Sequence, residues 1–199
     1  MLKTRVIPTL LLRNSVLVKS VQFKTYRPIG LPRQAARIYN MREVEEMVLL
    51  DIEARLQGRG PLIDVVTDLA EECFMPLAIG GGIRTVGDIR RLMKNGADKV
   101  VINTEAFEHP EFISESARVF GSQCIVVSID VKQNSPGEYE VITHAGKHPS
   151  GIDPVSWAQR AESLGAGEIL LTSMDRDGMM QGYDLDLVCA VSDAVPLPV

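Results

Sequence analysis

The chain has 199 residues, of which 45% are hydrophobic and 24% are charged, as expected for a folded globular domain rather than a disordered chain. Its 21 basic and 26 acidic residues leave a net charge of −5. With no long basic run and no apolar run of roughly 18 residues, neither a nucleic-acid partner nor a membrane partner is expected.

Short apolar runs alternate with helical periods through the first half of the chain. Thr85 is a typical helix N-cap residue, and Gly96 marks the end of the helix that follows it. The apolar runs predict strands at 5–12, 46–52, 76–79 and 99–103, with an extra strand or flap at 16–23. The helical periods predict helices at 33–40, 61–72 and 86–95.

The second half continues this alternation. Asp153 followed by Pro154 is typical of an N-cap and a first helical residue. Strands are predicted at 124–131 and 168–173, a hairpin strand at 139–143, and helices at 110–120, 154–164 and 185–194. The pattern predicts an α/β fold, either a (β/α)8 barrel or a doubly wound sheet. The first βα turn has no GxGxxG, which weakens a Rossmann interpretation.

The chain also resembles itself at a spacing of 122 residues. The run starting at Glu46 matches the run starting at Glu168, and the helix residues and the later Pro76 and Pro198 match as well. The similarity is either chance agreement between two βα units or the mark of a barrel built from two related halves. In the second case, a barrel of roughly 250 residues would need two more strands. We therefore expect one domain, 1–199, truncated after about six βα units, with strands 7 and 8 missing.

Other features exclude several site types and compartments. The three cysteines form no CxxC pair and leave one over, so neither a disulfide framework nor a cysteine zinc site is expected, and a reducing cytoplasm fits. The histidines share no spacing with acidic residues, so we expect no metal site. The apolar start is broken by Pro8 and Arg13 and is not expected to be a signal peptide. Trp157 is expected to pack in the core.

Several motifs together resemble one family, the cyclase (synthase) subunit of imidazole glycerol phosphate synthase. They are RVIP at 5–8, VK at 18–19, FK at 23–24, LDI at 50–52, GGGIR at 80–84, GADK at 96–99, INT at 102–104, FGSQ at 120–123, ID at 129–130, GAGEILLTS at 165–173, DRDG at 175–178 and GYD at 182–184. The resemblance implies a TIM barrel of two half-barrels. It also implies a cyclase that takes ammonia from a glutaminase partner and acts on a bisphosphorylated ribonucleotide, with no cofactor.

Glycines after the third predicted strand suggest a phosphate site. Gly80–Gly82 lacks β-carbons, so its backbone N–H groups can approach an anion, although a plain tight turn would have the same sequence. The resemblance favours the phosphate site and implies a second phosphate end at the DRDG motif. The implied ligand-binding residues are Lys19, Asp51, Gly81, Gly82, Asn103, Thr104, Thr172, Asp177 and Gly178.

Asp130 ends an apolar strand, where a partly desolvated carboxylate can act as a general acid or base. A carboxylate that only caps a helix is the alternative. The resemblance implies two catalytic aspartates, of which Asp130 matches the second. Leu11 stands where the family has the first. Leucine cannot move a proton, so cyclisation is expected to fall by a large factor, since a positioned acid or base contributes about 10²–10⁴-fold.

Charged residues at the strand starts form a second candidate site. Arg5, Glu46, Lys99 and Glu168 would surround the lower mouth of a barrel, where ion pairs ordinarily stabilise the fold. The resemblance implies instead a salt-bridge gate through which ammonia enters from a glutaminase. Asp98 and Gln123 match positions that face this partner.

Three roles remain open at this stage. The chain is a cyclase of histidine biosynthesis, or a non-cyclising paralogue that channels ammonia to a sugar-amidating enzyme of surface-polysaccharide biosynthesis, or an inactive remnant. The retained gate and the lost aspartate suit the second role, whereas the retained Asp130 and phosphate motifs suit the first.

Overall fold

The computed structural model describes residues 5–199 and divides the chain into two compact units. One unit holds the chain up to Lys19 together with Arg27–Val100, and the other holds Ser20–Tyr26 together with Val101–Val199. Within the described residues there are seven α-helices and ten strands. None of these helices is long and apolar enough to cross a membrane. The expectation of one domain over 1–199 stays a prediction.

The first unit is a parallel sheet with helices in its connections. Strand β1 runs parallel to β4, β4 runs parallel to β5, and β2 pairs antiparallel with β1. Strand β6 (Lys99–Ile102) contains the boundary between the units. The elements before it are β1 (Thr9–Arg13), β2 (Val16–Val21), β3 (Thr25–Gly30), α1 (Pro32–Met41), β4 (Met47–Asp51), α2 (Ile63–Ala70), β5 (Leu77–Gly80) and α3 (Val86–Lys94).

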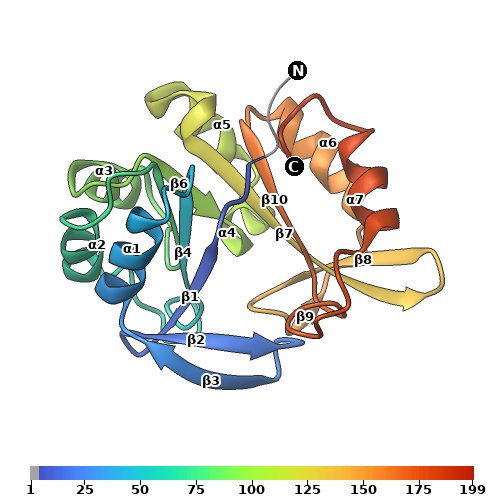
Figure 1. Ribbon diagram of the computed structural model, residues 1–199. Coiled ribbons are helices and arrows are strands. Elements are labelled where there is room, and N and C mark those ends of the chain that lie inside the picture. The colour runs from blue at the N-terminus through green and yellow to red at the C-terminus, as the bar shows by residue number, and fades with distance from the viewer. Residues whose placement is uncertain (1–4) are drawn as a thin grey trace. The chain divides into compact units, whose positions relative to one another are not determined.

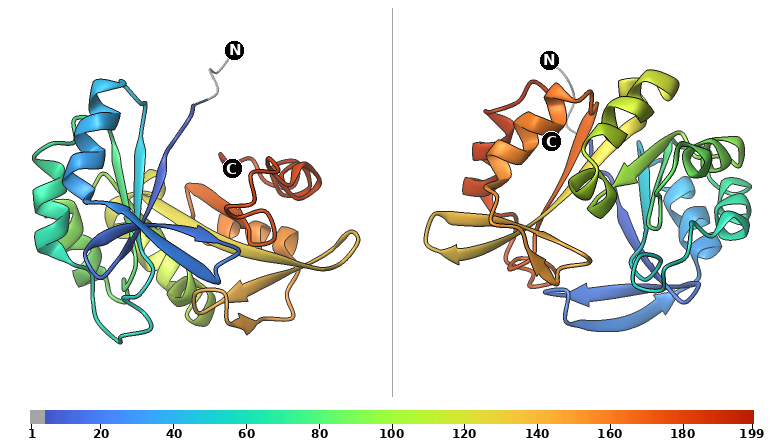
Figure 2. Two further views of the ribbon diagram at one scale, coloured as in Figure 1. Left: turned by 60° about the horizontal axis from the view of Figure 1, so that its bottom comes forward. Right: turned by 180° about the vertical axis from the view of Figure 1, so that it is seen from behind.

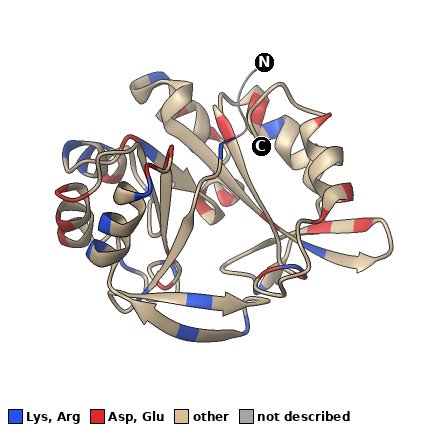
Figure 3. Cartoon of the chain, in the orientation of Figure 1, with Lys and Arg blue, Asp and Glu red and all other residues tan. Residues whose placement is uncertain are grey.

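Helices α1, α2 and α3 of this unit lie side by side along one face of its strands (Figure 1; Figure 2). The core of this unit includes buried apolar residues of the strands, such as Leu49 and Ile79, and of the helices, such as Leu69 and Ile89. Outside the core, charged side chains cover α1 and α2 (Figure 3), and Arg37 Nη2 lies 2.8 Å from Glu72 Oε1. Each helix is therefore amphipathic, as the spacing of its apolar residues predicts.

The second unit is built around one long strand. Strand β7 pairs antiparallel with β8 and parallel with β10, and β9 pairs with β8. Helices α6 and α7 lie beside each other along these strands (Figure 1; Figure 2). Its elements are α4 (Thr104–Glu108), α5 (Glu111–Phe120), the 3₁₀ turn η1 (Ser122–Cys124), β7 (Ile125–Ser135), β8 (Glu138–Thr143), β9 (His148–Pro149), α6 (Pro154–Ser163), β10 (Glu168–Ser173) and α7 (Leu185–Ser192).

Local signals in the sequence place the helix starts correctly. Thr85 caps α3 and forms a capping box with Asp88, in which each side chain accepts the other residue's backbone N–H. Asp153 caps α6 by accepting the Ser156 N–H at 2.8 Å, and Pro154 is the first helical residue. Trp157 is 2% exposed and contacts Phe107, with ring centroids 5.0 Å apart, which confirms its packing role.

Other boundaries differ from the predictions for identifiable reasons. Strand β1 begins at Thr9 rather than Arg5, and β7 continues to Ser135 because its far end pairs with the β8 hairpin strand. Strand β3 was not predicted, since it is largely exposed and contains Pro28. Helix α4 has five residues, too few for a helical period to be visible.

Backbone hydrogen bonds confirm the internal repeat and place one copy in each unit. Met47 N–H donates to Pro76 O at 3.0 Å, and its counterpart Ile169 N–H donates to Pro198 O at 2.9 Å. The matching helices α2 and α7 both have eight residues, and their bounds differ by the same 122 positions. The fold is thus mixed α/β with a parallel-rich sheet, as in a TIM-barrel family. Closure into a barrel stays a prediction.

Candidate functional site

Most of the predicted ligand residues lie at or just after the carboxyl ends of parallel strands. In the first unit, Asp51 is the last residue of β4, and Gly81 and Gly82 directly follow β5, while Lys19 is exposed on β2. In the second unit, Asn103 and Thr104 follow β6, Thr172 lies near the end of β10, and Asp177 and Gly178 are in the loop after it. Asp130 lies inside β7 rather than at its end.

Asp51 is held by an arginine that sequence reasoning did not single out. Arg59 Nη2 donates to Asp51 Oδ1 at 2.9 Å, and Arg59 Nη1 lies 2.6 Å from Asp51 Oδ2. Asp51 Oδ1 also accepts the backbone N–H groups of Glu53 and Ala54, each at 3.1 Å. This two-point contact fixes a carboxylate that is 8% exposed and orients the β4–α2 loop.

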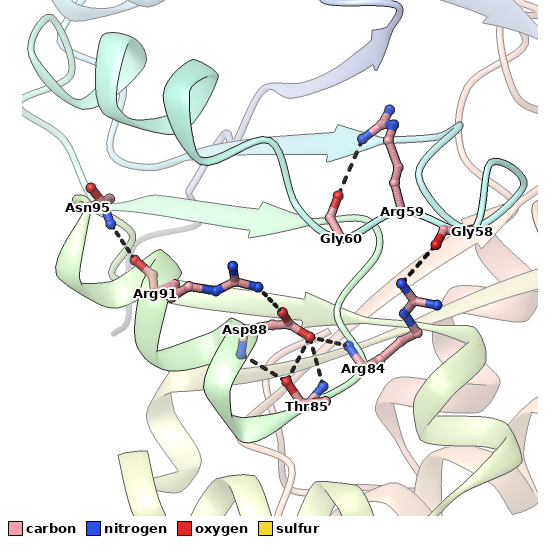
Figure 4. A network of polar contacts seen from close by, with 8 residues as sticks. All are labelled: Gly58, Arg59, Gly60, Arg84, Thr85, Asp88, Arg91 and Asn95. Carbon is pink, nitrogen blue, oxygen red and sulfur yellow. Dashed lines mark hydrogen bonds and ion pairs between the residues drawn. The ribbon is translucent and has the colours of Figure 1, made fainter.

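The same loop packs against the glycines that follow β5. Gly81 has φ +108°, and a methyl group there would overlap the backbone carbonyl of Asp51, while one on Gly82 would overlap that of Arg59. Figure 4 shows Arg84 reaching from the glycine side to Gly58 O at 3.0 Å. Glycine is thus required here for close packing of two loops. The role of these glycines in holding a phosphate stays a prediction.

Asp130 is the most perturbed carboxyl group of the second unit. Burial raises its pKa from 3.8 to about 7, the nearby Asp177 carboxylate adds to the rise, and hydrogen bonds from Asn103 and Thr172 oppose it. Asn103 Nδ2 donates to Asp130 Oδ2 at 2.9 Å. A carboxyl group that titrates near neutral pH can both give and take a proton, as a general acid or base must.

Strand register shows which residue takes the equivalent place in the first copy of the repeat. Asp130 pairs with Thr172 on the parallel strand β10 and with Ile142 on the hairpin strand β8. Leu11 pairs with Leu50, the counterpart of Thr172, on β4, and with Val18 on the hairpin strand β2. Leu11 therefore occupies in the first unit the position that Asp130 occupies in the second.

Asp177 is engaged by the end of β2 and the turn that follows it, which belong to the same unit. Its carboxylate accepts Ser20 Oγ at 2.5 Å and the Phe23 backbone N–H at 3.4 Å. A methyl group on Gly178 would overlap the Ser20 carbonyl. The sequence places Asp177 and Gly178 at a phosphate end, and the structure adds Ser20 as the side chain that holds this aspartate.

Three of the four predicted gate residues form a compact ion cluster in the first unit. Glu46, 2% exposed, accepts Arg5 Nη1 at 2.9 Å and Lys99 Nζ at 2.7 Å. One buried carboxylate between two cations has a partner for each oxygen, which offsets the desolvation of its charge. Glu46 directly precedes β4, Lys99 is the first residue of β6, and Arg5 lies four residues before β1.

The remaining residues of that predicted face lie where strands begin. Glu168 is the first residue of β10 and is partly exposed. Asp98 has a structural contact, since its Oδ2 accepts the Leu77 N–H at 2.9 Å. Gln123 is exposed in η1. Their part in a gate or a partner interface stays a prediction.

The contacts of Arg59 and Ser20 were not predicted, because each depends on the path of a loop, that of Arg59 itself and that of Asp177. Arg59 follows Asp51 by eight residues in a glycine-flanked loop, a weak signal that a nearby aspartate has a cation partner. Ser20 meets Asp177 across 157 residues, and no sequence pattern predicts that contact. Among residues 5–199, no three His, Cys, Asp or Glu side chains are grouped as a metal site.

Repeated βα units with polar residues at the strand carboxyl ends define an α/β protein whose candidate ligand residues lie mostly at the carboxyl ends of its parallel strands. A family model described as histidine biosynthesis protein matches residues 5–199. The chain belongs to this family.

Proposed function

We propose that the chain is an ammonia-handling subunit that works with a glutaminase and delivers ammonia to another enzyme without cyclising the histidine-pathway substrate itself. The acceptor would be a sugar-amidating enzyme of surface-polysaccharide biosynthesis. The observation that carries this proposal is Leu11, which stands at the register position of Asp130 in the other copy of the repeat.

The lost aspartate removes one side of an acid–base pair. Asp130 can still exchange a proton, but Leu11 offers no second acid–base group. Since ring closure and bond cleavage need protons moved at two places, a single carboxyl group leaves one of these steps unassisted. Cyclisation is therefore the part of the family reaction that this chain is least equipped to perform.

The retained ion cluster supports the ammonia-handling part of the proposal. Arg5, Glu46 and Lys99 hold the charged arrangement that the resemblance assigns to ammonia entry. Ordinary stabilisation of the fold needs no such buried carboxylate, because apolar residues of similar volume do as well. A chain that keeps this cluster but has leucine in place of the family aspartate at position 11 would keep ammonia delivery.

A second candidate is the cyclase of histidine biosynthesis, and the surroundings of Asp130 favour it. Its pKa of about 7, its contact with Asn103 and its register with Thr172 suit a working acid or base. The two candidates differ in one measurable property, the formation of imidazole glycerol phosphate.

Complementation separates the candidates. The chain would be expressed in a histidine auxotroph that lacks the cyclase subunit, with ammonium salt in the medium so that a mismatched glutaminase is not limiting. The proposal expects no growth without histidine, although the protein is present in the soluble fraction. Growth at the rate given by an authentic cyclase subunit would establish the second candidate and overturn the first.

Leu11→Asp tests the reason for that outcome. Restoring the second carboxylate is expected to raise ammonia-dependent cyclisation by about 10²-fold over the parent chain, measured on purified protein with the bisphosphorylated ribonucleotide. Leu11→Asn is the matched control, since it has nearly the same shape and polarity but does not exchange a proton in this range. Equal rates for the two variants would show that position 11 has no acid–base role.

A further inference from the structure

The two copies of the repeat differ in how their strand and helix are covered. In the first unit, β4 pairs with β1 on one side and with β5 on the other, and α2 contacts both α1 and α3. In the second unit, β10 pairs with β7 and α7 contacts α6. On the other side of β10, Ile169 N–H bonds to Pro198 O, and no further strand pairs with β10 within residues 5–199. The first copy therefore shows which elements fit this side of the repeat, namely a parallel strand and a helix.

The side that lacks such a cover in the second copy is apolar. Leu49 and Val66 of the first copy are each 2% exposed, whereas their counterparts Leu171 and Val188 are only half-buried. Leu185, the first residue of α7, is 68% exposed. Apolar side chains that lack cover together are typical of an interaction surface.

A contact in the first copy shows which face of α7 is concerned. Thr67 Oγ1 of α2 lies 3.2 Å from Oδ1 of Asn95, the residue that directly follows α3. The counterpart of Thr67 in α7 is Cys189. Leu185 lies four residues before Cys189 and Ser192 three residues after it, so the three share one helix face. All three are exposed.

The charges of the two copies indicate the chemistry of the cover. Residues 177–199 include four aspartates and no basic residue, and two of them, Asp186 and Asp193, are exposed near the two ends of α7 (Figure 3). Its counterpart α2 is acidic as well, and α3, which contacts α2, exposes three cations, namely Arg90, Arg91 and Lys94. Two α7 helices facing each other would bring aspartates together, so charge disfavours a second copy of this chain as the cover.

We infer that the β10–α7 face, formed by Leu171 on the strand and by Leu185, Val188, Cys189 and Ser192 on the helix, is a docking surface for a partner protein. The partner presents an apolar strand followed by a basic amphipathic helix. Its strand pairs in parallel with β10, as β5 pairs with β4, and its helix lies on α7, as α3 lies beside α2. The inference is independent of the proposed function, because it uses neither the ion cluster nor the loss of an aspartate.

A labelled peptide with the sequence of residues 76–96 is the probe, since this stretch supplies β5 and α3 in the first copy. Fluorescence anisotropy should show that the full chain binds it about tenfold more tightly than a peptide in which Arg90, Arg91 and Lys94 are replaced by glutamate. The difference should shrink at high salt, which screens exposed charges. In hydrogen exchange, the bound peptide should protect the amides of 170–173 and 185–192.

Variants of the full chain test the charges and the apolar contact separately. Asp186→Lys combined with Asp193→Lys should reverse the preference, so that the glutamate peptide binds more tightly. One of these changes opposes the helix dipole and the other favours it, so α7 should keep its stability. Glu111→Lys combined with Glu115→Lys makes the same charge change at exposed positions of α5 and should leave the preference unchanged. Leu185→Ser should weaken binding of the basic peptide several-fold.

Four results would overturn the inference. They are no binding of either peptide to the parent chain, equal binding of both peptides, protection of α2 without protection of α7, and a dimer in analytical ultracentrifugation that Leu185→Ser dissociates. The third result would mean that the peptide merely displaces α3 from α2. The fourth would mean that a second copy of the chain occupies the β10–α7 face.

Discussion

At the scale of single residues, the sequence predicts where the carboxylates lie better than what surrounds them. Asp51 and Asp130 stand out because each follows a buried apolar run, and the end of a run shows in the sequence. Arg59, which holds Asp51, lies in a loop, whereas Ser20, which holds Asp177, lies near the end of strand β2 and meets an aspartate in a distant loop. Loop contacts depend on the path of the backbone, which has no periodic signature, so these partners could not be predicted.

Asp130 gives the residue-scale prediction, a pH dependence of stability. In the unfolded chain the carboxyl group loses its proton near its ordinary pKa of 3.8, whereas in the folded protein it keeps it up to about pH 7. Between these two pH values unfolding releases a proton, so the free energy of unfolding falls as the pH rises. This loss of stability is complete above about pH 7. Over that whole window it amounts to about 4 kcal/mol.

Asp130→Asn removes this titration. Relative to the parent chain, the variant should gain about 2 kcal/mol or more in free energy of unfolding between pH 5 and pH 8, measured with urea at each pH. Asp64→Asn, at an exposed position of α2, is the control. Its free energy of unfolding should differ from that of the parent chain by the same amount at every pH in this range. Parallel pH profiles for Asp130→Asn and the parent chain would show that Asp130 ionises freely in the fold.

At the scale of elements, helix starts were predictable and edge strands were not. An N-cap is decided by one side chain and the next three residues, so Thr85 and Asp153 reveal their helices directly. Strand β3 has no buried face to impose alternation, and helix α4 is too short to show a period. Strand β3 could not be predicted because it is not amphipathic, and helix α4 could not be predicted because it is too short.

The α3 capping box gives the element-scale prediction. Thr85→Ala removes the hydroxyl that accepts the Asp88 N–H at 3.1 Å and donates to Asp88 Oδ2 at 2.9 Å. It should lower the free energy of unfolding by about 1 kcal/mol. Thr85→Ser keeps the hydroxyl and should recover most of that loss in the same denaturant titration. If serine were as destabilising as alanine, the threonine methyl group rather than the cap would be the stabilising part.

At the scale of the whole molecule, the repeat was predictable because its spacing is constant over a strand, a loop and a helix. Single identities between two βα units carry little weight, but the backbone bonds at Pro76 and Pro198 fall at the same spacing. The division of the chain into two compact units was not predicted, because it depends on contacts between residues that are remote in sequence. Barrel closure depends on the same kind of contact.

The repeat gives the prediction at this scale. Leu69 on α2 and Val191 on α7 are equivalent, and both are 0% exposed. Leu69→Ala should lower the free energy of unfolding by about 2 kcal/mol or more, and Val191→Ala by somewhat less, because valine loses one carbon fewer. Val188→Ala, at a half-buried position of the same helix, should have the smallest effect. A negligible loss at Val191 would show that the second copy no longer packs like the first.

The contact between Ser20 and Asp177 has a consequence for the order of events during folding. Hairpin β1–β2 closes over a few residues and can form early, whereas Ser20 near the end of β2 finds its partner only across 157 residues. Closing so long a loop is entropically costly until the intervening elements are in place. We therefore expect the end of β2 and the Asp177 loop to be among the last parts of their unit to acquire their native form.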